Sequence, residues 1–598
     1  MKDFIKYTLA SILGFMIAGV LLIFLTVTGI AGMVASASAD APVTVTDNMV
    51  YRLEIPGTVV ERGVDNPFAQ FMGGAPESVG LDEIMASLEA AAENDHIKGV
   101  YFRPSMFSAC GAATRTAIRR GLENFKKSGK FIVAYADFYS TGMYDLATVA
   151  DKVLLNPVGH LSWHGMSANL AFYPDLMKKF GVKMQIFKVG TYKSAVEPYM
   201  LTGMSKASRE QTRIFIDDIW NGVCREVAES RGLNVDSLNM FADSFMDLQS
   251  PRLALERGMV DGLVYEDEAD DYVRELCGLG KGKKLRVLSM KDVNNLKTAP
   301  KKMPHMGSDE IAVYFASGEI DAPKAMVTGG GIDSKRVARD LRKLREDKAV
   351  KAVVLRVNSP GGSAYGSEQM WNEVRKFRGV KPLVVSMGDY AASGGYYMSC
   401  WADTIVAEGN TLTGSIGIFG MFPDPTELLT KKLEIHYDGV KTNAMSDFGE
   451  MGRHMSAPER AVMQQHIEQG YALFLKRVAE GRGMRVEDVA KIAEGRVWTG
   501  ETALKIGLVD VIGGLERAVE IAAGKVGLIG EDGAEHFKTR FYPAKPGIFD
   551  NLMKTKDDYM ALKLRGEFGR YSRLVDLLMN IDKMDHVQAR MPFVEIAE

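Results

Sequence analysis

The sequence repeats itself at an interval of about 250 residues, and this feature constrains the fold more than any other. Similar segments recur in the same order with a nearly constant offset. They pair 150–152 with 402–404, 228–233 with 479–484, and 254–261 with 503–510. A constant offset over several matches is hard to obtain by chance. The chain is therefore expected to contain two copies of one domain.

We predict four segments along the chain. An N-terminal segment covers 1–40, a first repeat 45–300, a second repeat 305–540 and a C-terminal tail 541–598. A basic linker with Pro300 and Pro304 separates the repeats, because proline interrupts regular structure. The tail is polar and weakly periodic, and we expect only a helix near 570–583 in it.

Short apolar runs alternate with helical patterns in both repeats. The runs predict buried strands at 97–102, 131–135, 311–315, 352–357 and 382–387. Helices are expected at 367–377 and 457–479. Alternation of strands and helices indicates an α/β fold with crossover connections.

The N-terminal segment has the composition of a membrane anchor. No charged residue lies between Lys6 and Asp40, and a bilayer-spanning helix needs about 20 apolar residues. Lys2 and Lys6 precede the run, which favours a cytoplasmic N-terminus. We predict one transmembrane helix that contacts lipid through residues 7–34, with the rest of the chain on the outer side. The alanines and serines at 35–41 are also typical of a cleavage site, so removal of the segment stays open.

Composition and spacing exclude several classes of partner. The 73 lysines and arginines against 76 aspartates and glutamates leave a net charge of −3, so no basic excess is available to bind nucleic acid. The four cysteines form no CxxC pair, and the nine histidines form no HExxH motif. We therefore expect neither a metal nor an organic cofactor.

The second repeat contains two glycine-rich stretches, 356–363 and 387–397, each following a predicted strand. Ser393 in the second stretch stands among alanines and glycines at a strand-to-helix turn, where its hydroxyl is accessible and near the positive end of a helix dipole. Paired glycines let backbone amides point at a ligand. The alternative is a tight turn that packs small residues.

The first repeat has lost this serine but contains a candidate base. Thr141 stands where Ser393 would be, whereas Lys193 lies in a stretch whose second-repeat counterpart has Thr442. Each repeat therefore holds half of a site, which is complete only where the halves meet. A lysine activates a serine only if burial keeps the amine neutral, and Glu197 must then point elsewhere. The alternative is a solvated surface lysine.

Four motifs together resemble the long, tandem-repeat form of the bacterial signal peptide peptidase A family, also called protease IV. They lie at 192–198, 358–362, 391–397 and 411–420. The resemblance implies tandem Clp-protease/crotonase-like domains of strand-strand-helix units. It also implies site roles: Ser393 as nucleophile, Lys193 as general base, the amides of Gly362 and Gly394 as oxyanion hole, and Ser415 to position the lysine.

The resemblance implies a membrane-anchored serine endopeptidase that cleaves residual signal peptides and other apolar peptides. It further implies a homotetramer in the bacterial cytoplasmic membrane, with the catalytic body on the periplasmic side. Two alternatives remain: a crotonase-like acyl-CoA enzyme, and an inactive membrane-tethered scaffold. The sequence also leaves open whether the lysine and serine meet within one chain or between neighbouring chains.

Overall fold

The computed structural model describes most positions between 6 and 24, together with 46–63, 78–280, 282–296, 309–322, 331–530, 534–545, 585–592 and 595–597. The helix predicted at 570–583 and the end of the predicted anchor, from residue 25 onward, lie outside these residues. Among the residues that are described, no helix is both long enough and apolar enough to cross a bilayer.

The first repeat is built on a six-stranded parallel sheet in the order β10-β1-β4-β5-β6-β9. Its strands are β1 (Met49–Ile55), β4 (Ile97–Pro104), β5 (Phe131–Tyr139), β6 (Lys152–Leu161), β9 (Gly262–Leu263) and β10 (Arg286–Leu288). The helices α3 (Leu81–Glu93), α4 (Ala112–Lys126) and α5 (Thr141–Ala147) share one core with this sheet, and α10 (Glu266–Leu276) covers the opposite face. Strands buried on both faces explain the continuous apolar runs in the sequence.

The second repeat has a corresponding sheet in the order β18-β16-β14-β12-β11-β20, in which only the β16–β18 pair is antiparallel. Its strands are β11 (Asp309–Ser317), β12 (Val350–Ser359), β14 (Leu383–Ala392), β16 (Leu412–Gly414), β18 (Val497–Thr499) and β20 (Phe537–Tyr542), with β15 (Thr404–Ala407) and β19 (Val511–Ile512) at its side. Helices α12 (Ser334–Glu346), α13 (Ala364–Val374), α14 (Gly394–Ser399) and α15 (Ala457–Arg482) lie over one face and α18 (Leu515–Lys525) over the other. The five predicted strands and two predicted helices are confirmed within a few residues.

A third, four-stranded sheet joins the two repeats. Its order is β13 (Gly361–Ser363), β21 (Val587–Arg590), β17 (Phe419–Asp424) and β8 (Lys183–Lys188), and every pair is antiparallel. β8 comes from the first repeat and β21 from the tail. The tail also supplies β22 (Glu595–Ala597), which pairs with β7 (Ser167–Asn169). Neither tail strand is expected from the sequence.

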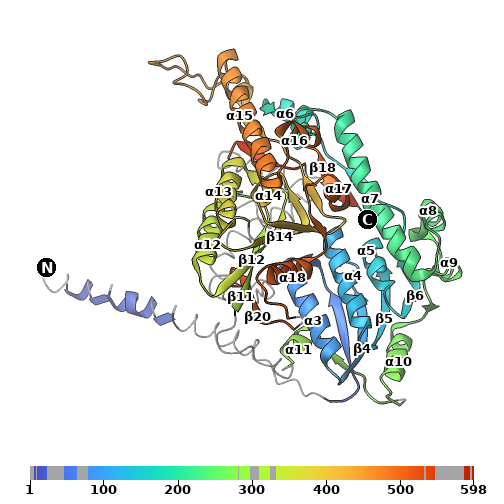
Figure 1. Cartoon of the computed structure of the whole chain (residues 1–598). Coiled ribbons are helices and arrows are strands. Elements are labelled where there is room, and N and C mark those ends of the chain that lie inside the picture. The colour runs from blue at the N-terminus through green and yellow to red at the C-terminus, as the bar shows by residue number, and fades with distance from the viewer. Residues whose placement is uncertain are drawn as a thin grey trace.

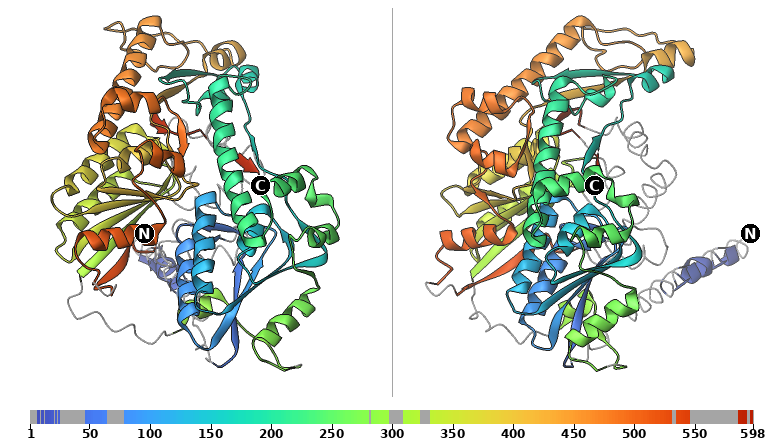
Figure 2. Two further views of the ribbon diagram at one scale, coloured as in Figure 1. Left: turned by 45° about the vertical axis from the view of Figure 1, so that its right-hand side comes forward. Right: turned by 90° about the vertical axis from the view of Figure 1, so that its right-hand side faces the viewer.

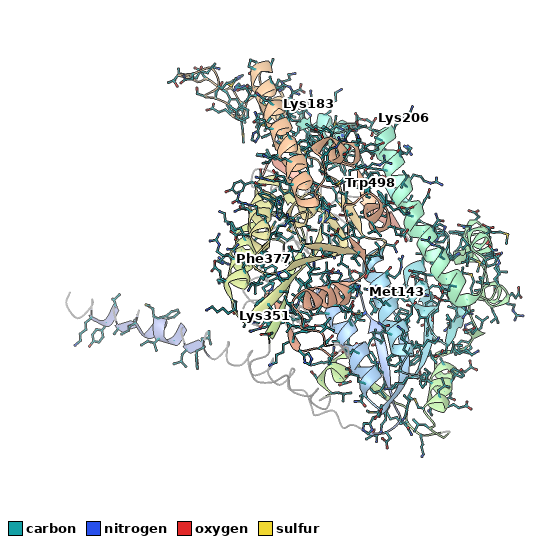
Figure 3. The ribbon with its side chains drawn as sticks, viewed as in Figure 1. Met143, Lys183, Lys206, Lys351, Phe377 and Trp498 are labelled. Carbon is teal, nitrogen blue, oxygen red and sulfur yellow. The ribbon has the colours of Figure 1, made fainter. Side chains whose placement is uncertain are left out.

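The segment of the first repeat around β8 leaves its own sheet and lies on the second repeat. Helix α6 (Pro174–Phe180) lies at the upper end of the molecule (Figure 1), where Met177 packs with Phe419 and Met421 of β17. Lys183 of β8 and Lys206 of α7 are labelled at this end, whereas Met143 of α5 lies lower in the first repeat (Figure 3). The long helix α7 (Lys206–Arg231) returns the chain to the first repeat (Figure 2).

A buried ion pair links the two repeats. Glu61 follows β2 (Thr58–Val60) and binds Arg356 of β12 through two hydrogen bonds, of 2.9 and 3.0 Å. Their side chains are 5% and 2% exposed. Burial opposes the charge of Arg356, but the Glu61 carboxylate outweighs it and raises the pKa of the guanidinium. Glu61 also accepts a hydrogen bond of 3.0 Å from Asn358, beside the glycine-rich loop.

We predict that Glu61→Ala destabilises the protein by about 3–5 kcal/mol, because it removes the carboxylate that neutralises the buried charge of Arg356. The measurement is chemical denaturation followed by circular dichroism. Asp217→Ala is the matched control, since it removes the exposed pair that Asp217 forms with Arg213 and should cost less than about 1 kcal/mol. Equal losses in the two variants would contradict the structural role of Glu61.

Candidate active site

Ser393 occupies the turn between β14 and α14 and is fully buried. Its backbone has φ 54° and ψ −109°, a conformation that costs a non-glycine residue about 1–3 kcal/mol and is typical of functional sites. Two hydrogen bonds of 2.7 Å hold it there: its N–H donates to Gly414 O, and its carbonyl accepts from Tyr397 N–H. The turn therefore fixes the hydroxyl at the N-terminus of a helix.

Lys193 reaches this serine from the first repeat, a few residues after β8. The neighbouring Tyr192 N–H donates to Glu494 O at 3.0 Å, which ties the segment to the second repeat. Gly495, at φ 80°, allows the two backbones to approach, because a β-carbon there would lie 2.6 Å from Lys193 Cα. The lysine side chain is consequently threaded into the interface between the repeats, with none of its surface exposed.

The two predicted halves of the site meet within one chain. Lys193 Nζ lies 2.8 Å from Ser393 Oγ, across a sequence separation of 200 residues. The same nitrogen lies 3.1 Å from Ser415 O and 3.2 Å from Ser415 Oγ. Ser415, at φ 47°, is fixed by a hydrogen bond of 2.7 Å from its N–H to Arg496 O.

A neutral amine, with two N–H donors and one lone pair, can satisfy these three contacts. The carbonyl of Ser415 can only accept, so one N–H of Lys193 donates to it. In the neutral form the second N–H can donate to Ser415 Oγ, which leaves the lone pair for the hydroxyl proton of Ser393. Burial lowers the pKa of the Lys193 amine well below its usual value. The environment therefore favours the form that can accept the serine proton.

The carboxylate of Glu197 points away from the amine, as a neutral lysine requires. Glu197 is buried and accepts hydrogen bonds from Ser205 Oγ at 2.6 Å and Ser205 N–H at 3.1 Å. Ser205 is the N-cap of α7. Glu197, the acidic residue of the motif, therefore binds the N-cap residue of α7 and not the Lys193 amine.

The glycine-rich loop after β12 places the amide of Gly362 beside the serine. Gly361 N–H donates to Ser359 Oγ at 3.2 Å and Ser363 N–H donates to Ile320 O at 3.0 Å. Gly362 pairs with Ala589 of β21. Gly394 must lack a side chain, because a β-carbon there would lie 2.5 Å from Ser367 Oγ. Gly362 and Gly394 therefore lie on the loop and the turn that flank Ser393, where we expect the oxyanion hole from the sequence.

Sequence patterns missed Gln211 of α7, which positions the lysine segment. Its Nε2 donates to Tyr192 O at 3.0 Å and Ser194 Oγ at 2.9 Å, and its Oε1 accepts from Val497 N–H at 3.2 Å. A single glutamine in a long helix carries no recognisable motif. Its role is visible only from the contacts across the repeats.

The second-repeat counterpart of Lys193 lies at the surface. Thr442 is exposed, and the neighbouring Lys441 pairs with Asp447 at 3.3 Å. The segment 433–450 around them is almost entirely exposed, whereas the segment around Lys193 is buried. The two copies of this stretch therefore have different surroundings, in agreement with only one of them contributing to the site in this chain.

Comparisons with known proteins agree with this arrangement. A family model described as peptidase family S49 matches residues 124–280 and 375–528, so Lys193 lies in the first match and Ser393 and Ser415 in the second. A "Protease 4" from Haemophilus influenzae is 35% identical over 475 residues, which cover 78% of this chain and 76% of that protein.

Two further relatives carry similar names. A "Serine protease SPPA, chloroplastic" from Arabidopsis thaliana is 31% identical and covers 75% of this chain and 66% of its own length. A "Putative signal peptide peptidase SppA" from Enterococcus faecium is 39% identical over a shorter match, which covers 30% of this chain and 52% of that protein.

Proposed function

Because the chain belongs to peptidase family S49, we propose that Ser393 and Lys193 are the catalytic dyad of this serine protease and that it cleaves residual signal peptides and other apolar peptides. The observation that carries the proposal is the distance of 2.8 Å between Lys193 Nζ and Ser393 Oγ in a fully buried site. The family favours this function over an acyl-CoA enzyme or an inactive scaffold.

The proposed reaction is acyl transfer to the serine. The lone pair of Lys193 takes the proton of Ser393, and the alkoxide attacks the carbonyl carbon of the peptide bond. The amides of Gly362 and Gly394 stabilise the tetrahedral oxyanion. Lys193 then gives its proton to the leaving amine. A water molecule, deprotonated by the same lysine, hydrolyses the ester, and Ser415 holds the amine in place throughout.

The test is cleavage of synthetic signal peptides by the purified chain, followed by chromatography and mass spectrometry. We expect products cut beside small or apolar residues. Ser393→Ala is the control for contaminating peptidases. An absence of products from every signal peptide, with a folded protein in the assay, would contradict the function.

The pH dependence of kcat/KM should report the lowered pKa of Lys193. The neutral amine is the active form, so activity rises with pH through that lowered pKa and levels off well below the usual lysine value of about 10.4. The contribution of Lys193 to the free energy of unfolding also rises with pH. Between the two pKa values the unfolded chain binds one proton more than the folded chain, so the free energy of unfolding from this group rises with pH. An acid limb that reaches the usual lysine pKa would contradict a neutral Lys193.

The N-terminal segment supports the proposed attachment to a membrane. Its described apolar side chains are mostly exposed, with Phe15 at 85% and Leu22 at 68%, and its described helical residues lie away from the body of the molecule (Figure 1). We propose a single-pass anchor in the bacterial inner membrane, with the catalytic body on the periplasmic side. Fractionation of cells that express the chain with and without residues 1–40 tests this proposal.

The proposed assembly is a homotetramer of tandem Clp-protease/crotonase-like domains. In each chain the first repeat seats its β8 segment on the second repeat, but the corresponding segment of the second repeat exposes Leu433, Val440 and Met451 at 56%, 104% and 65%. A head-to-tail contact with the next copy would cover these side chains and close a ring. Light scattering measures the mass of the assembly, and charged substitutions at Val440 should reduce it.

A further inference from the structure

Helix α12, at the outer edge of the second repeat (Figure 1), carries an excess of positive charge. Its carboxylates are Asp340 and Glu346. Its lysines and arginines are Lys335, Arg336, Arg339, Arg342, Lys343 and Arg345. The chain as a whole has a net charge of −3, so the positive charge is concentrated on this helix and is not a general property of the surface.

The corresponding helix of the first repeat has the opposite charge. α3 precedes β4 as α12 precedes β12, and its charged residues are Asp82, Glu83, Glu89 and Glu93. The two helices occupy the same place in two copies of one domain. The fold itself therefore does not require lysines and arginines at this position.

The turn after α13 extends the basic face. This turn consists of the short 3₁₀ helix η4 (Arg375–Phe377) and residues 378–381. Lys381 Nζ donates to Leu344 O at 3.0 Å, which holds the turn against the last part of α12. Arg375 and Arg378 are exposed on it. The helix and the turn therefore form one continuous surface.

Some cations of this surface are neutralised within the chain. Buried Glu373 binds Arg342 at 2.7 Å, Arg345 at 3.1 Å and Lys376 at 2.9 Å.

Other exposed cations of the surface are not neutralised. In the part of the chain that the structure describes, no carboxylate lies within ion-pair distance of Lys335, Arg336, Lys343, Arg375 or Arg378. Their charges are available to a partner of opposite sign.

An aromatic and apolar rim borders the free cations. Trp401 is partly buried and lies edge-on to Trp371, with ring centroids 5.6 Å apart. The guanidinium of Arg378 lies 4.8 Å from the centroid of the Trp401 ring. Val380, in the same turn, is 62% exposed. Tryptophan and exposed aliphatic side chains beside lysines and arginines are typical of surfaces that enter the headgroup region of a bilayer.

We propose that α12 and residues 375–381 form a docking face for anionic phospholipid headgroups, with α12 flat on the membrane surface and Val380 inserted into it. Each exposed lysine or arginine strengthens binding to an anionic membrane. The 13 residues of α12 span about 20 Å, which lets its cations meet several headgroups.

The docking face is connected to the candidate active site through one layer of helices. α12 packs on α13, and α13 packs on α14, whose N-cap residue is Ser393. Contact between α12 and lipid therefore sets the orientation of the site relative to the bilayer. A single N-terminal anchor tethers the chain but leaves this orientation free.

The test is reconstitution of the full chain with vesicles of phosphatidylcholine alone or of phosphatidylcholine with an equal part of phosphatidylglycerol. Amine acetylation followed by mass spectrometry measures the accessibility of Lys335. On the anionic vesicles Lys335 should react at least about 5-fold more slowly than on the neutral ones, and high salt should remove the difference by screening. Lys476 of α15, which is 61% exposed, should react equally on both.

Charge reversal identifies the face. Lys343→Glu combined with Arg378→Glu should abolish the protection of Lys335. Arg213→Glu combined with Lys491→Glu is the matched control, because it reverses as many charges at positions of α7 and α16 (Val486–Ile492) that are 74% and 70% exposed. The control variant should keep the protection.

Each outcome decides for or against the docking face. Equal labelling of Lys335 on both vesicles, with the chain bound to both, overturns the face and leaves the anchor. Binding to the anionic vesicles alone, with Lys335 protected, supports the face without the anchor. A chain that binds neither vesicle overturns both. None of these results depends on peptide cleavage, so a failure of the proposed peptidase function is distinguishable from a failure of this inference.

Discussion

Replacing Lys193 with methionine is expected to lower kcat for peptide cleavage by at least about 1,000-fold while the protein remains folded. General-base catalysis contributes about 10²–10⁴, and the lysine also supplies the proton for the leaving amine. Methionine keeps most of the volume of the side chain in a site that is 0% exposed. Steady-state kinetics with a fluorogenic peptide gives the loss.

The same substitution should raise the melting temperature at neutral pH. Burial lowers the pKa of Lys193, which means that folding either deprotonates the amine or buries a charge, and both cost free energy. Methionine removes this cost and with it the dependence of stability on pH described above. A Lys193→Met enzyme with full activity, or one that is destabilised at every pH, would contradict the assigned role.

Arginine at position 193 is the informative comparison. It keeps the positive charge and the reach of the side chain but stays protonated at any working pH. We expect Lys193→Arg to be as inactive as Lys193→Met and less stable than it. Activity in the arginine variant would mean that position 193 acts by charge alone and takes no proton from Ser393.

The α/β class and the pair of site residues could be predicted because both depend on patterns within short stretches. Strands such as β4 and β12 are apolar runs, since they are buried on both faces. The serine lies between alanines and glycines. Thr141 in its place in the first repeat, together with Lys193 in that repeat, indicated that the site is divided. Comparison of one repeat with the other supplied information that neither copy has alone.

The features that escaped prediction depend on contacts between distant segments. β8 pairs with β17, and Glu61 pairs with Arg356, over separations that no local period can reveal. β21 is only four residues long and includes the polar Gln588 and Arg590. It is a strand because it pairs with the edges of β13 and β17. Its conformation is therefore set by these neighbours and not by its own sequence.

Replacing Ser393 with alanine is expected to remove all measurable peptidase activity, with a loss of about 10⁴–10⁶ in kcat. The nucleophile is lost, yet the hydrogen bonds from Ser393 N–H to Gly414 O and from Tyr397 N–H to Ser393 O come from the backbone and survive. The double variant with Lys193→Met should be no less active than Ser393→Ala alone, because the two residues act as one unit. A serine-directed acylating reagent should label wild-type protein at Ser393 and label Lys193→Met far more slowly. Labelling of the alanine variant at the wild-type rate, or additive losses in the double variant, would show that another residue is the nucleophile.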